Sequence, residues 1–199
     1  MGCVNLKVER CHLWGPGEYA HKIQNRNNML SAFVHFSPID QKPQLKSGNW
    51  YIKDITVNNV DNFFIYNFKD GLWQTGQPFT SVRFENIKAE GILKAFYIYG
   101  DTARLFKMIV NNSYFSHRKT SSANYNKFEG SVFRSREFFY AENFDSIFID
   151  KVTLKEYSNT ALASFVSGNN LTISRFSSGS RLDVQPYIFS KIVNVNIRE

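Results

Sequence analysis

A short pattern of alternating apolar and polar residues recurs along this chain and constrains its fold more than any other feature. Two clear copies read Ile55-x-Val57-x-Asn59-Val60 and Val82-x-Phe84-x-Asn86-Ile87. Alternation with a period of two is typical of a strand with one buried face. The Asn favours a turn, because its amide bonds to nearby backbone and it tolerates left-handed dihedrals. Each copy therefore predicts a strand that ends at a corner.

Related apolar pairs occur elsewhere, at Leu6/Val8, Met108/Val110, Ile147/Ile149, Leu171/Ile173 and Val193/Val195. From residue 55 the copies begin at 55, 82, 108, 147, 171 and 193, which are 27, 26, 39, 24 and 22 residues apart. A period in the twenties is typical of a solenoid, in which each turn packs against its neighbours. We expect residues 1–199 to form one solenoid domain, with loop insertions near residues 37–49 and 116–136.

The fold class follows from the pattern and from an aromatic composition of 19 Phe and 10 Tyr, which favours strands. Leucine-rich repeats place their Asn one residue later, and helical repeats need a period of 3.6 that does not persist here. The sequence therefore predicts an all-β chain, a single-stranded right-handed parallel β-helix of about seven or eight coils. Asn59, Asn86 and Asn112 hold one position of the pattern and are predicted to stack as a ladder, with Lys151 and Arg175 in that register later.

The segments 52–60, 79–91 and 169–173 resemble the later coils of the pectin-lyase-like β-helix superfamily, most closely the polygalacturonase-type glycoside hydrolases of family 28. The resemblance covers most of the chain and rests on a repeat pattern shared by hydrolases, lyases, tailspikes and adhesins. It implies an acidic polysaccharide such as pectin as the substrate. It also implies a secreted, periplasmic or cell-surface protein, of which this chain is the C-terminal part.

The acidic catalytic motifs of that hydrolase family, an Asp-Asp pair among them, are absent from this chain, as is its Gly-His-Gly segment. Its later Arg-Ile-Lys segment has a partial counterpart in His21-Lys22-Ile23. The resemblance therefore implies that Lys22, with His21 beside it, contacts a substrate carboxylate, and that the missing acids lie upstream of Met1.

The remaining site predictions come from residue chemistry. Basic residues such as Arg83 pair with uronate carboxylates, and aromatic rings such as that of Trp73 stack on sugars. Stacking of coils can also bring Asp61 near Lys88 or Glu90 of the next coil. The four histidines have no metal-ligand spacing, so we expect no metal and no cofactor. An extended chain separates Cys3 from Cys11 too widely for a disulfide.

The chain carries 24 Lys and Arg against 17 Asp and Glu, a net charge of +7. This favours an acidic partner, for which we expect a polysaccharide rather than a nucleic acid. No apolar run is long enough to predict a membrane span. Three functions stay open: a polygalacturonase-like hydrolase or its C-terminal portion, a non-catalytic polysaccharide-binding, adhesion or tailspike-like β-helix, and a uronan lyase. An uncapped N-terminal end predicts a homo-oligomer through that end.

Overall fold

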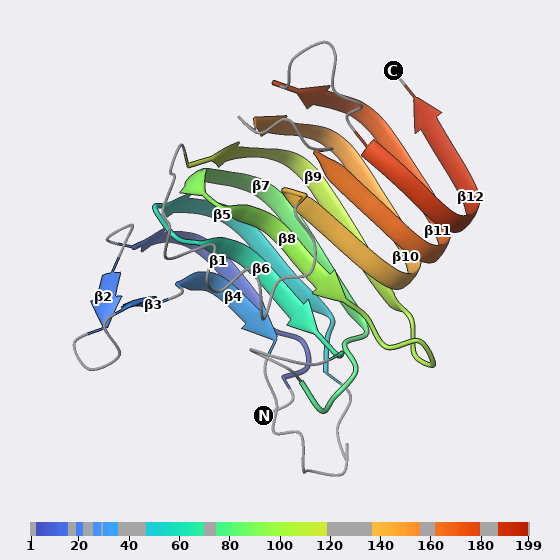
Figure 1. Cartoon of the computed structure of the whole chain (residues 1–199), viewed down its shortest axis with the longest axis horizontal. Coiled ribbons are helices and arrows are strands. Elements are labelled where there is room, and N and C mark those ends of the chain that lie inside the picture. The colour runs from blue at the N-terminus through green and yellow to red at the C-terminus, as the bar shows by residue number, and fades with distance from the viewer. Residues whose placement is uncertain are drawn as a thin grey trace.

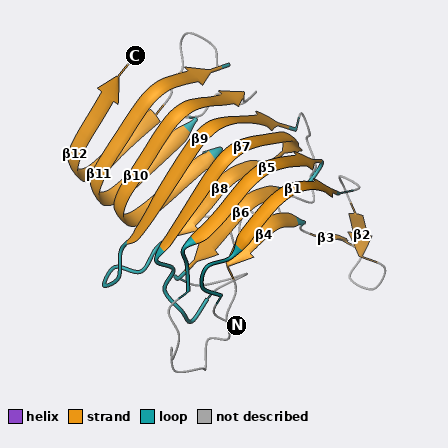
Figure 2. Cartoon of the chain, turned by 180° about the vertical axis from the view of Figure 1, so that it is seen from behind, coloured by secondary structure: helices purple, strands orange, loops and turns teal. Residues whose placement is uncertain are grey.

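The computed structural model describes residues 3–15, 19–21, 26–28, 30–35, 47–69, 75–118, 137–155, 162–179 and 187–198. All regular elements in these residues are strands, and Figure 2 accordingly shows strands and loops only. They are β1 (Lys7–Trp14), β2 (Tyr19–His21), β3 (Arg26–Asn28), β4 (Ser31–His35), β5 (Trp50–Asn58), β6 (Asn62–Asn67), β7 (Ser81–Ile92), β8 (Lys94–Tyr99), β9 (Phe106–His117), β10 (Phe139–Lys155), β11 (Ala163–Ser178) and β12 (Tyr187–Arg198).

The strands stack in two parallel ladders. The first ladder runs β1, β5, β7, β9, β10, β11 and β12, and every pairing in it is parallel. The second runs β4, β6, β8 and β10, again in parallel, and both ladders meet in the long strand β10. Figure 1 shows the stack rising from β1 to β12, with the two termini at opposite ends. The prediction of an all-β chain of stacked parallel strands is confirmed, and this arrangement is consistent with a parallel β-solenoid.

Single residues with left-handed backbone dihedrals bend the strands of the first ladder. Arg10, Asp54, Asn86, Asn112, Lys151 and Arg175 have φ between 46° and 54°. Their neighbours pair in register from one strand to the next, so these six residues form one column, here called the corner column. A second bend, at Asn143, Ser167 and Lys191, separates the two halves of β10, β11 and β12. A left-handed residue other than glycine costs roughly 1–2 kcal/mol, and it turns the chain without a loop.

The predicted Asn ladder is wrong at Asn59. Trp50 pairs with Val82 and Ile52 with Phe84, so Asp54 and not Asn59 lies opposite Asn86. The Nδ2 of Asn86 donates to Asp54 at 2.6 Å, and the Nδ2 of Asn112 donates to Asn86 at 3.4 Å. Asn59 also has a positive φ of 56°, but it belongs to another bend, where its Oδ1 closely approaches Gly91. The pattern occurs in two phases within residues 50–60, and the structure uses the earlier one for the corner column.

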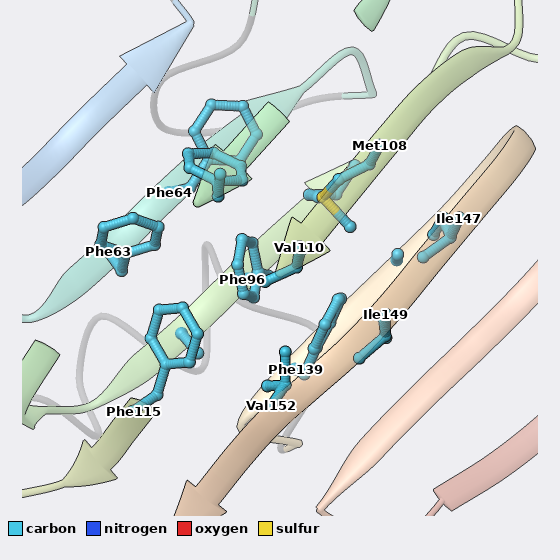
Figure 3. Packing of buried hydrophobic residues seen from close by; sticks show 14 of the residues in the cluster. Phe63, Phe64, Phe96, Met108, Val110, Phe115, Phe139, Ile147, Ile149 and Val152 are labelled. Carbon is cyan, nitrogen blue, oxygen red and sulfur yellow. The ribbon is translucent and has the colours of Figure 1, made fainter. Parts of the chain in front are cut away.

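The core lies between the two ladders and is largely aromatic. Figure 3 shows the rings of Phe63, Phe96 and Phe115, which come from β6, β8 and β9, lying near one another. Their centroids are 5.2 to 5.6 Å apart. Phe96 continues the stack to Phe139 of β10 at 4.4 Å. Trp50 is buried in the same core. Because these residues come from different coils, the packing fixes the stacking of the coils as well as their interior.

Several boundaries differ from the expected ones. Arg26–Asn28 is a short strand that pairs antiparallel with β2. In the loop expected near 37–49, Ser47 and Gly48 form parallel bridges to Phe79 and Val4, while residues 36–46 lie outside the described part. The insertion expected at 116–136 begins later, because β9 extends to His117, and residues 119–136 are likewise not described. Cys3 and Cys11 are free thiols.

Glycine substitutions at two positions of β11, one at the bend of Ser167 and one away from it, should change the free energy of unfolding in opposite directions. Ser167→Gly should raise the free energy of unfolding by up to about 1 kcal/mol, because glycine adopts a φ of 53° without steric cost. Thr172→Gly, on the extended part of β11, should lower it by about 1 kcal/mol. Urea denaturation of both variants measures the difference, and a loss of stability in Ser167→Gly would contradict the assigned backbone.

Candidate binding groove

A surface groove of about 370 Å³ crosses the first ladder beside the corner column. Its lining comes from β5, β7, β9 and β10 and comprises Lys53, Asp54, Arg83, Glu85, Asn86, Asn111, Asn112, Asp150 and Lys151. In-register pairing explains why these residues meet. Lys53, Glu85, Asn111 and Asp150 occupy one outward column, and the corner column lies next to it. With strands about 4.8 Å apart, four neighbouring strands give the groove a length of about 14 Å.

Glu85 is the carboxylate with the most partners in the groove. Its Oε2 accepts hydrogen bonds from Arg83 Nη2 at 2.7 Å and from the hydroxyl of Tyr51 at 3.0 Å. Lys53 Nζ lies 3.7 Å from Oε1, and the Arg83 guanidinium lies over the Tyr51 ring at 5.6 Å. Desolvation acts to raise the pKa of Glu85, but the hydrogen bonds from Tyr51 and Arg83 outweigh it and lower the pKa below its ordinary value.

Asp150 is held in the same ionised state. It accepts a hydrogen bond from Arg175 Nε at 2.8 Å, a second one from Arg175 Nη2, and one from Ser174 Oγ at 2.8 Å. The bond from Arg175 is the main reason that the pKa of Asp150 is lowered, desolvation opposes it, and the bond from Ser174 adds to it. Asp150 is therefore a charged hydrogen-bond acceptor at neutral pH.

These two carboxylates do not form an acid–base pair for glycoside hydrolysis. They lie on β7 and β10, with β9 between them, so their backbones are about 10 Å apart. An inverting hydrolase needs one carboxyl group that is protonated and one that is ionised. The pKa values of Glu85 and Asp150 are both lowered, so neither serves as the acid. Over the described ranges, no three His, Cys, Asp or Glu residues are placed to hold a metal ion.

The groove also contains unsatisfied polar groups. The Oδ1 of Asn111 is buried and accepts no hydrogen bond from any described residue. Lys151 is exposed, and it makes no ion pair with any residue of the described part of the chain. A buried acceptor without a donor costs free energy unless a ligand or water supplies the donor. The floor therefore offers an acceptor, and the rim offers a cation.

The predicted site residues are distributed as follows. Arg83, Asn86 and Asn112 line the groove, and Asn59 does not. Lys22 and Trp73 lie outside the described residues, and of His21 only the backbone in β2 is described. Among the ion pairs of the described residues, Asp61 is paired with neither Lys88 nor Glu90. It binds Arg118, whereas Lys88 and Glu90 pair with each other at 3.0 Å.

The sequence did not bring together the groove residues Lys53, Asp54, Glu85, Asn111 and Asp150, whereas it did place Lys151 in the register of the ladder. The signal that finds them is the earlier phase of the repeat in β5, Trp50-x-Ile52-x-Asp54. With this phase Asp54 aligns with Asn86 and Asn112, and Lys53 aligns with Glu85 and Asn111. Because the repeat was aligned on Asn59 instead of Asp54, neither the outward column nor the correct ladder could be recognised from the sequence.

Comparison with known proteins identifies no relative, since no family model, no curated protein and no solved structure matches this chain. The resemblance to polygalacturonase-type hydrolases stays a prediction. Within the described residues, no helix has the length and apolarity that crossing a bilayer requires.

The ionisation of Glu85 is directly testable. Arg83→Met and Tyr51→Phe should each raise the pKa of Glu85, because each removes a hydrogen bond that stabilises the carboxylate. The control Lys88→Met, which breaks the separate pair with Glu90, should leave it unchanged. Carboxyl titration by carbon NMR reads the result. A Glu85 that titrates above an ordinary glutamate in the unmodified protein would restore it as a candidate acid.

Proposed function

We propose that this chain is a right-handed parallel β-helix of about seven or eight coils that binds an acidic polysaccharide in the groove and does not cleave it. The seven strands of the first ladder support this number of coils. The observation that carries the function is the groove itself, which is lined by charged and amide side chains from four neighbouring strands. A polysaccharide ligand places the protein outside the cell or at its surface.

The chemistry of the lining fits a hydroxyl-rich, anionic chain. Carboxylates and amides such as Glu85, Asp150 and Asn111 accept hydrogen bonds from hydroxyl groups. Arg83 and Lys151 are placed to bind carboxylates, and bonds between charged partners are stronger than neutral ones. The groove lining balances three cations against three carboxylates, while the chain as a whole carries +7. That excess favours the approach of an anionic polymer.

Binding is favoured over hydrolysis because both well-placed carboxylates are held ionised, which suits acceptors and not a general acid. Hydrolase and lyase activities become outcomes of the test. Incubation with polygalacturonate should release neither reducing sugar nor unsaturated product. Release of either would replace the binding function with the corresponding enzyme.

The binding test compares a variant that removes two groove cations, from β7 and β10, with a variant that removes a cation of β10 outside the groove. The double variant Arg83→Met/Lys151→Met should weaken binding to oligogalacturonate at least tenfold, because two charge-assisted hydrogen bonds are lost. The control Lys155→Met removes an exposed cation of β10 that does not line the groove and should bind as the unmodified chain does. Calorimetric titration gives both constants, with a neutral glucan as the ligand control. Equal affinity in the double variant and its control would refute binding in the groove.

We also propose that copies of this chain associate, through β12 rather than through the N-terminal end. β12 contains four exposed large apolar side chains, Ile188, Val193, Val195 and Ile197, and among the described strands it pairs only with β11. Val195 is 42% exposed although it continues the core-facing column of Leu171. At the other end, Leu6 and Val8 are half-buried, and two large apolar side chains, Val4 and Trp14, are exposed. Exposed apolar strand edges favour pairing with another chain.

Val195→Lys should therefore shift the sedimentation profile toward the monomer, because it places a charge on the contact. Asn196→Lys, its outward-facing neighbour, should leave the association unchanged. Circular dichroism establishes that both variants are folded. A monomeric unmodified chain at micromolar concentration would contradict the association.

A further inference from the structure

A second cluster of charged side chains lies away from the groove, where the end of β9 meets the starts of β6, β8 and β10. Six residues form it, here called the polar corner: Asp61, Asn62, Lys94, His117, Arg118 and Glu137. Lys94 is only 2% exposed, and Asp61 is 5% exposed. Charged residues are rarely buried this deeply unless they are paired.

The polar corner is held by a few specific bonds. Arg118 Nη2 lies 2.6 Å from Asp61 Oδ1, and Asp61 Oδ2 accepts a bond from the backbone N–H of Leu30 at 2.7 Å. Lys94 Nζ donates to the backbone carbonyl of Glu137 at 3.0 Å. The backbone N–H of Arg118 donates to the carbonyl of Ile92 at 2.6 Å. These contacts join the last residues of β9 to the strands on either side.

Several polar side-chain atoms of the polar corner are buried without a hydrogen bond to any described residue. Eight buried side-chain polar atoms lack a hydrogen bond in the described residues, and five of them are here: Asn62 Oδ1, His117 Nδ1, Arg118 Nε, Arg118 Nη1 and Glu137 Oε2. Each such atom costs about 1–3 kcal/mol relative to a paired one. Because opening exposes these atoms to water, the corner is expected to open more readily than the well-paired ladders.

His117 supplies the imidazole of the corner, the group that a proton converts into a cation. Its ring packs edge-on against Phe138, with centroids 5.7 Å apart. Two cations, Lys94 and Arg118, share the corner with the imidazole and act on its titration, and Asp61 and Glu137 belong to the same corner. Burial first, and then Lys94 and Arg118, lower the pKa of His117 to about 4.

We propose that the polar corner is an acid-sensitive latch, which opens when a proton on the imidazole of His117 places a third cation beside Lys94 and Arg118. Opening separates Arg118 from Asp61 while the parallel ladders elsewhere stay paired. The imidazole titrates near 4 in the closed corner and near 6.5 in an open one, so the open form binds more protons. Opening is therefore favoured as the pH falls from 6.5 toward 4, and its equilibrium constant should rise about twentyfold between pH 7 and pH 5.

Hydrogen exchange tests the latch. Rates are measured by mass spectrometry at pH 7 and pH 5 and corrected for the intrinsic pH dependence of exchange. Peptides from residues 92–118 should open about twentyfold more at pH 5, and peptides from residues 171–178 should not change. A change below threefold in the corner peptides would overturn the proposal.

Two matched histidine variants test whether His117 causes the acid-dependent opening. His117→Phe keeps an aromatic ring against Phe138 but takes no proton, so the acid-dependent opening should disappear. His35→Phe replaces the other buried histidine, which bonds to Ser47 at 2.7 Å and packs against Trp50 and Phe79, and should retain the opening. Opening that persists in His117→Phe would reject the latch.

If His117→Phe fails to fold, a titration of the unmodified chain decides. Imidazole NMR should show His117 still neutral at pH 5. A His117 that becomes half-protonated near pH 6 or above would rule the latch out.

Discussion

In-register parallel pairing of the backbone is the constraint on which the rest of this structure depends. It places Trp50 over Val82 and Met108 over Ile147, so that one strand after another supplies the same inward position. A slip of one residue would turn every inward side chain outward. The aromatic core opposes such a slip, because the rings of Phe63, Phe96 and Phe115 interlock across different coils. The core thus depends on the pairing and also stabilises it.

The same pairing orders the outer surface. The corner column consists of residues other than glycine at a backbone conformation that ordinary side chains avoid, which carries a steric cost. Hydrogen bonds between stacked side chains partly offset this cost, as in the bonds from Asn112 to Asn86 and from Asn86 to Asp54. These bonds also aim the polar groups at the groove. Residues of the corner column therefore both turn the chain and line the groove.

The two charged clusters show how burial decides what a side chain can do. Glu85 and Asp150 lie at the surface with donors around them, and both pKa values fall, which makes them acceptors. His117 is half-buried beside the buried Lys94, and desolvation is the largest cause that lowers the pKa of His117. A proton added at the surface is screened by water, whereas one added inside is not. Chemistry that responds to mild acid is accordingly expected at the polar corner and not in the groove.

The sequence by itself determined the period-two strands, the all-β class and the existence of polar corners, because alternation and turn chemistry are local properties of a few residues. It did not determine the phase of the repeat at residues 50–60, since both Asp54 and Asn59 end an acceptable pattern, and only pairing with β7 selects Asp54. Nor did it reveal the strand β3, which has only three polar residues and pairs antiparallel with β2. The groove was decided by tertiary structure, because Lys53, Asn111 and Asp150 are far apart in the chain and become neighbours only when the strands stack.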